Sequence, residues 1–138
     1  MNYPEWNESA SDRELIEEFY EQLIVRYPEL KEDVEYNEGL LHIDMGYLQR
    51  LAEGLCKERK LKEAEACFSW VNSFFCRSKN ELKNAINVSF LEYFEFHHSL
   101  SEMEFENLMP VELFHGYKEM MDYMEKMAKD ANDSSKET

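Results

Sequence analysis

The chain of 138 residues contains few glycines and prolines, four and three respectively. Both residue types mark turns, and an all-β domain of this length needs many turns. Their scarcity, together with the lack of regularly spaced strand patterns, favours helices. No stretch approaches the ~18 apolar residues that a membrane-spanning helix requires. The sequence therefore predicts an all-α protein that does not cross a membrane.

A secretory signal and a disulfide framework are also missing. The first twelve residues, MNYPEWNESASD, are polar and acidic, with neither a basic nor an apolar signal region. Cysteine occurs at Cys56, Cys67 and Cys76, an odd number set among apolar neighbours. Secreted proteins usually contain an even number, paired in disulfides. We therefore expect three small buried thiols and a cytoplasmic protein.

Positive charge is scarce and unevenly distributed. Thirty acids stand against fifteen bases, for a formal net charge of −15. Residues 1–38 contain twelve acids and three bases, residues 84–112 contain six acids and no base, and residues 50–83 contain eight bases and five acids. Such a field repels nucleic acid and anionic membranes, and it accelerates encounter with a basic partner. The charge predicts a basic protein partner and no direct nucleic-acid or membrane binding.

The hydrophobic pattern predicts one domain of five or six helices. An apolar fraction of 43% is ordinary for a globular chain. Apolar residues recur at helical spacing in segments ending at Tyr27, over 44–57, over 61–76, from 78 onward, and from Pro110 to about Lys129. Segments 29–41 and 100–109 fit either a short helix or an irregular stretch. We expect residues 1–129 to form a single bundle or stack of helical hairpins, and residues 130–138 to be a disordered polar tail.

Three helix starts are predicted from capping patterns. Ser11 with Glu14, and Ser78 with Glu81, have the spacing of a capping box, in which each side chain bonds a free backbone amide. Asp44 is predicted to cap the helix over 44–57.

Residues 48–71 resemble the helix-turn-helix unit of a tetratricopeptide repeat. The resemblance rests on the residues Leu51, Gly54, Leu61, Ala64 and Phe68. In such units small residues allow close helix approach and a later aromatic residue fills the gap. The pattern does not recur about 34 residues further on, so one helical hairpin is expected rather than a solenoid.

A longer resemblance covers residues 41–94. The segments LHIDMGYLQRLAEGL, EAEACFSWVNSFF and ELKNAINVSFLEYF are similar to a family of small uncharacterised all-helical bacterial proteins, a domain of unknown function. The most specific piece is residues 84–92, a helix whose apolar run is punctuated by Asn84, Ser89 and Glu92. Members of such families occur among the immunity proteins of polymorphic-toxin systems. The resemblance implies no catalytic residues.

Known catalytic and metal-binding patterns are absent from the sequence. Glu95 and His98 have the Glu-x-x-His spacing of di-iron bundles, but those sites need a second such motif. There is no Gly-x-Ser-x-Gly motif and no glycine-rich phosphate loop. We expect no enzymatic activity, no metal and no cofactor.

The predicted contact surface combines acidic residues with one aromatic anchor. It comprises Glu14, Glu17, Glu18, Glu21, Glu102, Glu104, Glu106 and Phe96. The aromatic run Phe90, Tyr93, Phe94 and Phe96 spans too wide an arc for one buried stripe, which leaves one or two of these rings for an interface. The Met-rich last helix is expected to pack mainly in the core, the alternative being an adaptable face for a partner helix.

These features favour an immunity protein or inhibitor that masks a basic surface, such as that of a toxin nuclease. A nucleic-acid mimic that inhibits a defence complex is an alternative within the same binding class. A structural or oligomeric helical module is an alternative of another class, and the sequence leaves monomer and dimer open.

Overall fold

A computed structural model describes residues 11–92, 94 and 100–136; from residue 133 it describes the backbone alone. Every regular element in these ranges is helical, which confirms the all-α class. In chain order they are α1 (Arg13–Arg26), the 3-10 turn η1 (Pro28–Leu30), α2 (Lys31–Asn37), α3 (Leu41–Lys57), α4 (Leu61–Arg77), α5 (Glu81–Ala85), the π-helix η2 (Ile86–Leu91), α6 (Glu102–Leu108) and α7 (Val111–Lys136).

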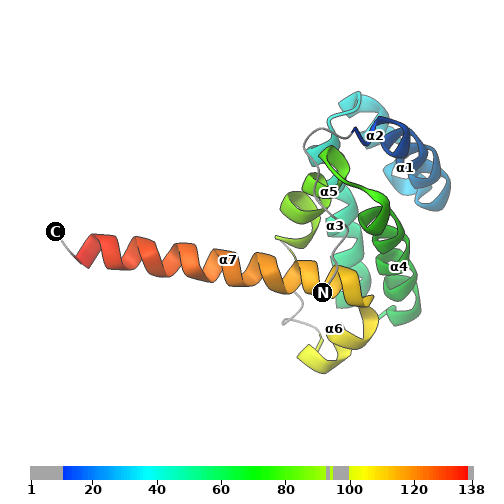
Figure 1. The fold of residues 1–138 in the computed structure, drawn as a ribbon. Helices are drawn as coiled ribbons and strands as arrows, with labels where there is room; N and C mark the ends of the chain where they lie inside the picture. Colours follow the sequence, from blue (N-terminus) through cyan, green and yellow to red (C-terminus); the bar gives the residue numbers. More distant parts are fainter. Residues whose placement is uncertain (1–10, 93, 95–99, 137–138) are drawn as a thin grey trace.

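The centre of the fold is the hairpin of α3 and α4. α3 packs against α4 and η2, and α4 also contacts α1 and α7. α1, η1 and α2 lie together at one end of this hairpin, and α6 lies at the other end (Figure 1). The core contains large residues from each layer, including Phe19, Leu48, Phe68, Phe90 and Phe105, all fully buried.

The predicted helical hairpin is confirmed, but Gly54 does not serve close packing. Arg59 adopts a left-handed conformation with φ of 57° between the two helices. Ala64 and Phe68 are fully buried, whereas a Cβ added at Gly54 would meet no atom within 4 Å. The close approach occurs at Gly116 of α7, where a Cβ would lie 3.0 Å from Leu91 Cδ1.

The three predicted helix caps are wrong. α1 has Asp12 at its N-cap position without a side-chain cap, and Ser11 Oγ accepts only the exposed Arg13 amide at 3.2 Å. α3 begins at Leu41, so Asp44 lies inside the helix. Ser78 donates its hydroxyl to the Phe75 carbonyl at the end of α4 instead of opening α5. Each pattern is local, and long-range contacts determine how these side chains are used.

Both ambiguous segments contain short helices. Residues 31–37 form α2, and residues 102–108 form α6. α6 begins with a true capping box, because Ser101 Oγ accepts the Glu104 amide at 3.1 Å and the Glu104 carboxylate accepts the Ser101 amide at 3.1 Å.

The last helix is longer than predicted. It continues to Lys136 rather than ending near Lys129, and therefore includes most of the segment expected to be a disordered tail. Its second half projects away from the other helices (Figure 1). Of the four methionines expected mainly in the core, Met120 and Met121 are half-buried, while Met124 and Met127 are exposed.

Candidate protein-binding surface

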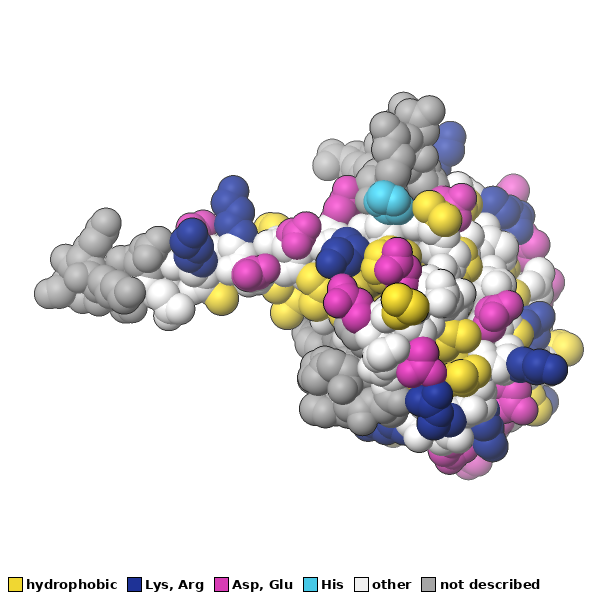
Figure 2. Space-filling view, turned by 90° about the horizontal axis from the view of Figure 1, so that it is seen from below, with side chains coloured by type: hydrophobic (Ala, Val, Ile, Leu, Met, Phe, Trp, Pro, Cys, Tyr) yellow, Lys and Arg dark blue, Asp and Glu magenta, His cyan; other side chains and the backbone are white. Residues whose placement is uncertain are grey.

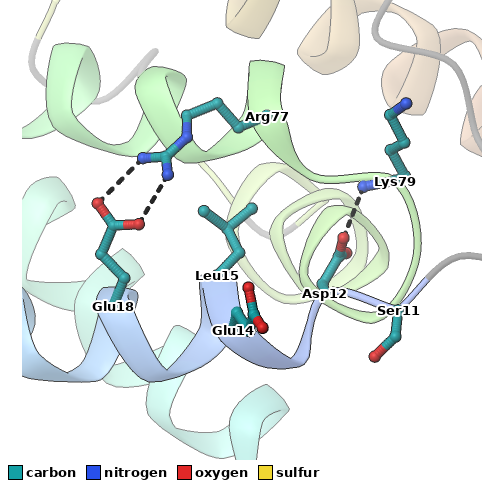
Figure 3. A pocket seen from close by; sticks show the side chains of 7 residues that line it. All are labelled: Ser11, Asp12, Glu14, Leu15, Glu18, Arg77 and Lys79. Carbon is teal, nitrogen blue, oxygen red and sulfur yellow. Dashed lines mark hydrogen bonds and ion pairs between the residues drawn. The ribbon is translucent and has the colours of Figure 1, made fainter.

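The acids of α1 differ in how far the fold neutralises them. Glu18 forms a bidentate pair with Arg77 of α4, at 3.1 and 2.7 Å, and this guanidinium lowers the pKa of the Glu18 carboxyl (Figure 3). Glu17 approaches Arg13 at 3.8 Å in an exposed pair. Glu14 and Glu21 are exposed and form no ion pair within the described part of the chain. Glu18 is therefore a structural residue as well as a surface acid.

Asp12 attaches the start of α1 to the start of α5. Its buried carboxylate accepts the backbone amides of Lys79 at 2.9 Å, Asn80 at 2.8 Å and Leu82 at 3.0 Å. Glu81 returns the interaction by accepting the Asp12 amide at 3.3 Å. The arrangement resembles a capping box whose two halves are nearly seventy residues apart in sequence.

A hollow of about 320 Å³ lies beside this joint. It is lined by Ser11, Asp12, Glu14, Leu15, Glu18, Arg77 and Lys79 (Figure 3). The Asp12 carboxylate and the Arg77 guanidinium are both engaged by the bonds that hold α1 in place. The positions of these two groups are therefore explained by the fold without a ligand.

The acids of α6 form a separate group. Glu102 and Glu106 are exposed, whereas Glu104 pairs with Arg59 at 2.5 Å and also caps its own helix. α6 packs on α4 at the end of the hairpin far from α1 (Figure 1). The face seen in Figure 2 carries acids and bases interspersed. The structure thus places the predicted α1 and α6 acids on two distinct surfaces.

The predicted aromatic anchor cannot be placed, since Phe96 lies outside the described residues, as do Tyr93, Glu95 and His98. Phe90 and Phe94 are buried and contact Phe68 at centroid distances of 6.3 and 5.4 Å, so neither is an interface anchor.

The predicted contact surface included the acids of α1 but left out those of α2, which lies beside it. We define the acidic lobe as residues 13–38, which form α1, η1 and α2 and contain nine acids and three bases. Within α2, Glu32 and Glu35 precede Tyr36 by four and one residues, and Tyr36 is 86% exposed. Val25 at the end of α1 is 78% exposed. The acids were visible in the sequence, but the exposure of Tyr36 could not be read without knowing that residues 31–37 are helical.

Asp44 holds the acidic lobe on the hairpin. Its carboxylate is fully buried and accepts the Tyr20 hydroxyl at 2.5 Å and the Asn37 amide nitrogen at 2.9 Å. One residue of α3 therefore binds both α1 and α2. Burial and this carboxylate raise the pKa of Tyr20 above its usual range, so the phenol remains a donor. The lobe is consequently a fixed surface.

Among the described residues, a serine–histidine contact comes nearest to a catalytic arrangement. His42 Nδ1 lies 2.8 Å from Ser89 Oγ, beside a hollow of about 350 Å³ lined also by Ile43, Gly46, Gln49 and Arg50. Nucleophilic catalysis requires a third group that orients the histidine. The described residues that line this hollow include no carboxylate.

The cysteines and metal ligands give no reactive site either. Cys56 and Cys67 are buried free thiols whose pKa is raised by burial to about 11, so they stay protonated and inert at neutral pH; Cys76 is half-buried. Among the described residues no three His, Cys, Asp or Glu side chains gather as they would around a metal ion. No helix in the described ranges has the length and apolarity needed to span a bilayer.

Comparison with known proteins identifies the family. Neither the curated proteins nor the solved structures contain a match to the chain. Residues 20–125 match the model of a family described as a domain of unknown function, DUF7674. This region includes α2 to α6 and the second half of α1, and it reaches into the projecting half of α7. The chain therefore belongs to the DUF7674 family.

Proposed function

We propose that the protein is a non-enzymatic binding module whose acidic lobe captures a basic protein partner. The observation that supports this proposal is the excess of acids in the acidic lobe, where nine acids, eight of them exposed, stand against three bases. Two of these bases, Arg13 and Lys31, form only exposed pairs at 3.8 and 3.9 Å. Exposed pairs of this kind are weak, and the acids of the lobe still outnumber its bases by six.

Exposed apolar side chains within the acidic lobe provide the other half of an interface. Tyr36 stands among Glu32, Asp33 and Glu35 on the short helix α2. Aromatic residues at the centre of a contact contribute most of its affinity, while the charges around them steer encounter and raise the association rate. We infer that the charges accelerate capture and that Tyr36 slows release.

In its most concrete form, the protein is an immunity protein or inhibitor that masks the basic surface of a cytoplasmic toxin, such as a nuclease. A nuclease must hold phosphates in a positively charged cleft, which a fixed acidic surface complements. The attachment of the lobe supports this role, since Asp12, Asp44 and Glu18 each join it to another helix. A surface that is already ordered loses little entropy on binding.

Charge reversal tests the proposal. The full chain is immobilised and used to capture partners from a lysate of its native host at low and high salt. Replacement of Glu14 and Glu21 by Lys should weaken retention of the main partner at least about tenfold at low salt. A matched variant, Glu63→Lys with Glu65→Lys, makes the same change of net charge on exposed positions of α4 and should retain binding.

A third variant decides whether α6 contributes. Glu102→Lys with Glu106→Lys should bind like the parent protein if the acidic lobe alone forms the contact surface. If retention of the partner changed neither with salt concentration nor with the Glu14 and Glu21 reversals, the electrostatic mechanism would be refuted. Equal losses in all three variants would show a nonspecific charge effect rather than a docking surface.

A further inference from the structure

The projecting half of α7 lacks a packing partner within the described molecule. Every residue from Asp122 to Asn132 is exposed, and the helix continues as backbone to Lys136 (Figure 1). This half has about four turns at 3.6 residues per turn. An isolated helix of that length is marginal in water, because most helical stability in proteins comes from packing of an apolar face. The projecting half of α7 therefore needs a surface of another molecule to pack against.

An apolar stripe runs from the buried half of α7 into the projecting half. Leu113, Tyr117, Met120, Met124, Met127 and Ala131 follow one another at alternating spacings of four and three. This is the heptad pattern of a coiled-coil seam. Leu113 and Tyr117 are buried in the core, whereas Met124 and Met127 are 38% and 54% exposed. In Figure 2 hydrophobic side chains follow one edge of the projecting helix, with charged groups beside them.

We propose that this stripe pairs with the same stripe of a second copy of the chain, with the two helices antiparallel. The charges favour this direction. Residues 119–125 contain three acids and no base, while residues 126–132 contain two bases and one acid. An antiparallel pair places the acidic half of each helix beside the basic half of the other. A parallel pair would place the two acidic halves together.

The sizes of the side chains fit the same arrangement. A register that sets Met124 opposite Met127 of the second copy also sets Met120 opposite Ala131. A large residue then faces a small one at each end of the contact, and Met124 and Met127 of both copies fill its centre. Such a contact is closed by a two-fold axis and uses one surface twice, as most homodimers do.

The geometry also reduces repulsion between the two strongly negative bodies. In this register the two Met121 residues, the last half-buried residues before α7 leaves the core, are separated by about 14 Å along the paired helices at 1.5 Å per residue. The Debye length at physiological ionic strength is about 8 Å. The separation exceeds this length, so salt weakens the repulsion between the two net charges of −15. The dimer does not depend on the acidic lobe having a partner.

The first experiment measures self-association of the full chain by analytical ultracentrifugation at physiological ionic strength. The protein should be a dimer that dissociates on dilution. Met124→Glu with Met127→Glu should raise the dissociation constant at least about tenfold, because each charge would be buried against an apolar surface. The matched control, Met103→Glu with Val111→Glu, introduces the same charges at exposed apolar positions outside the stripe and should leave the dimer intact. Near-ultraviolet circular dichroism checks that both variants keep the folded core.

The second experiment tests direction and register by oxidative crosslinking. A mixture of Met124→Cys and Met127→Cys proteins should form mixed disulfides faster than either protein forms disulfides with itself. A monomer at all concentrations, or a dimer unaffected by the two glutamates, would overturn the proposal. Faster crosslinking of each variant with itself would overturn the antiparallel arrangement.

Discussion

Replacement of Asp12 best tests whether the start of α1 is held by long-range hydrogen bonds or by the local capping box that the sequence predicts. The Asp12 carboxylate accepts three backbone amides at the start of α5, at 2.8 to 3.0 Å. The bond to Leu82 is buried, whereas those to Lys79 and Asn80 are partly buried. In Asp12→Ala the Leu82 amide has no replacement acceptor, while water can reach the other two more easily.

The magnitude follows from the three bonds. A buried hydrogen bond to a charged group contributes about 1.5–3 kcal/mol, and loss of a helix cap typically costs about 1 kcal/mol. We therefore expect Asp12→Ala to reduce the free energy of unfolding by about 3 kcal/mol. That is a large part of the 5–15 kcal/mol that is usual for a domain. Asp12→Asn keeps one acceptor oxygen and should cost roughly half as much.

Urea unfolding followed by tryptophan fluorescence measures this difference, because Trp70 is buried and stacks on Phe19 of α1 at a centroid distance of 5.2 Å. Ser11→Ala is the control, since the exposed Ser11 hydroxyl accepts only one amide and should change stability by less than about 0.5 kcal/mol. If Ser11→Ala were more damaging than Asp12→Ala, the capping box read from the sequence would operate and the long-range cap would not.

Two further predictions concern other buried polar groups. Lys83 is buried with its Nζ 2.9 Å from the Phe75 carbonyl oxygen, and burial lowers its pKa from 10.5 to about 8. The unfolded chain then binds more protons between these values, so Lys83 should contribute a rise in stability of about 1 kcal/mol from pH 8 to pH 9. This contribution is measured as the difference in pH dependence between the parent protein and Lys83→Met in urea titrations at each pH. The raised pKa of Cys56 and Cys67 should lower the stability of both proteins as the pH approaches and passes the ordinary thiol value, because these thiols stay protonated in the folded state only. Tyr20→Phe removes a hydrogen-bond donor from the buried Asp44 and should lower the free energy of unfolding by about 2 kcal/mol, measured by urea unfolding. The control Tyr36→Phe, at an exposed ring, should change it by less than about 0.5 kcal/mol. Equal effects of the two changes would show that the Tyr20 bond does not stabilise the lobe.

The acidic character of the candidate site could be predicted from composition, but its extent could not. Nine acids in residues 13–38 were visible without coordinates. Which of them remain available depends on partners far away in sequence, such as Arg77 for Glu18 and Arg59 for Glu104. The exposure of Tyr36 depends on how α2 packs against α1 and α3. Neither kind of information is contained in local spacing.

The sequence by itself determined the helical class and the position of the main helices, because apolar residues at spacings of three and four define one buried face wherever the helix packs. The ends of α1 at Arg26 and α4 at Arg77 fall within one residue of prediction for this reason. Only the tertiary structure decided that Asp12 caps α5, that Asp44 binds both α1 and α2, and that α7 extends beyond the core. A polar side chain can satisfy its hydrogen bonds locally or across the fold with similar energy. The choice therefore depends on which backbone groups the packed helices bring within reach.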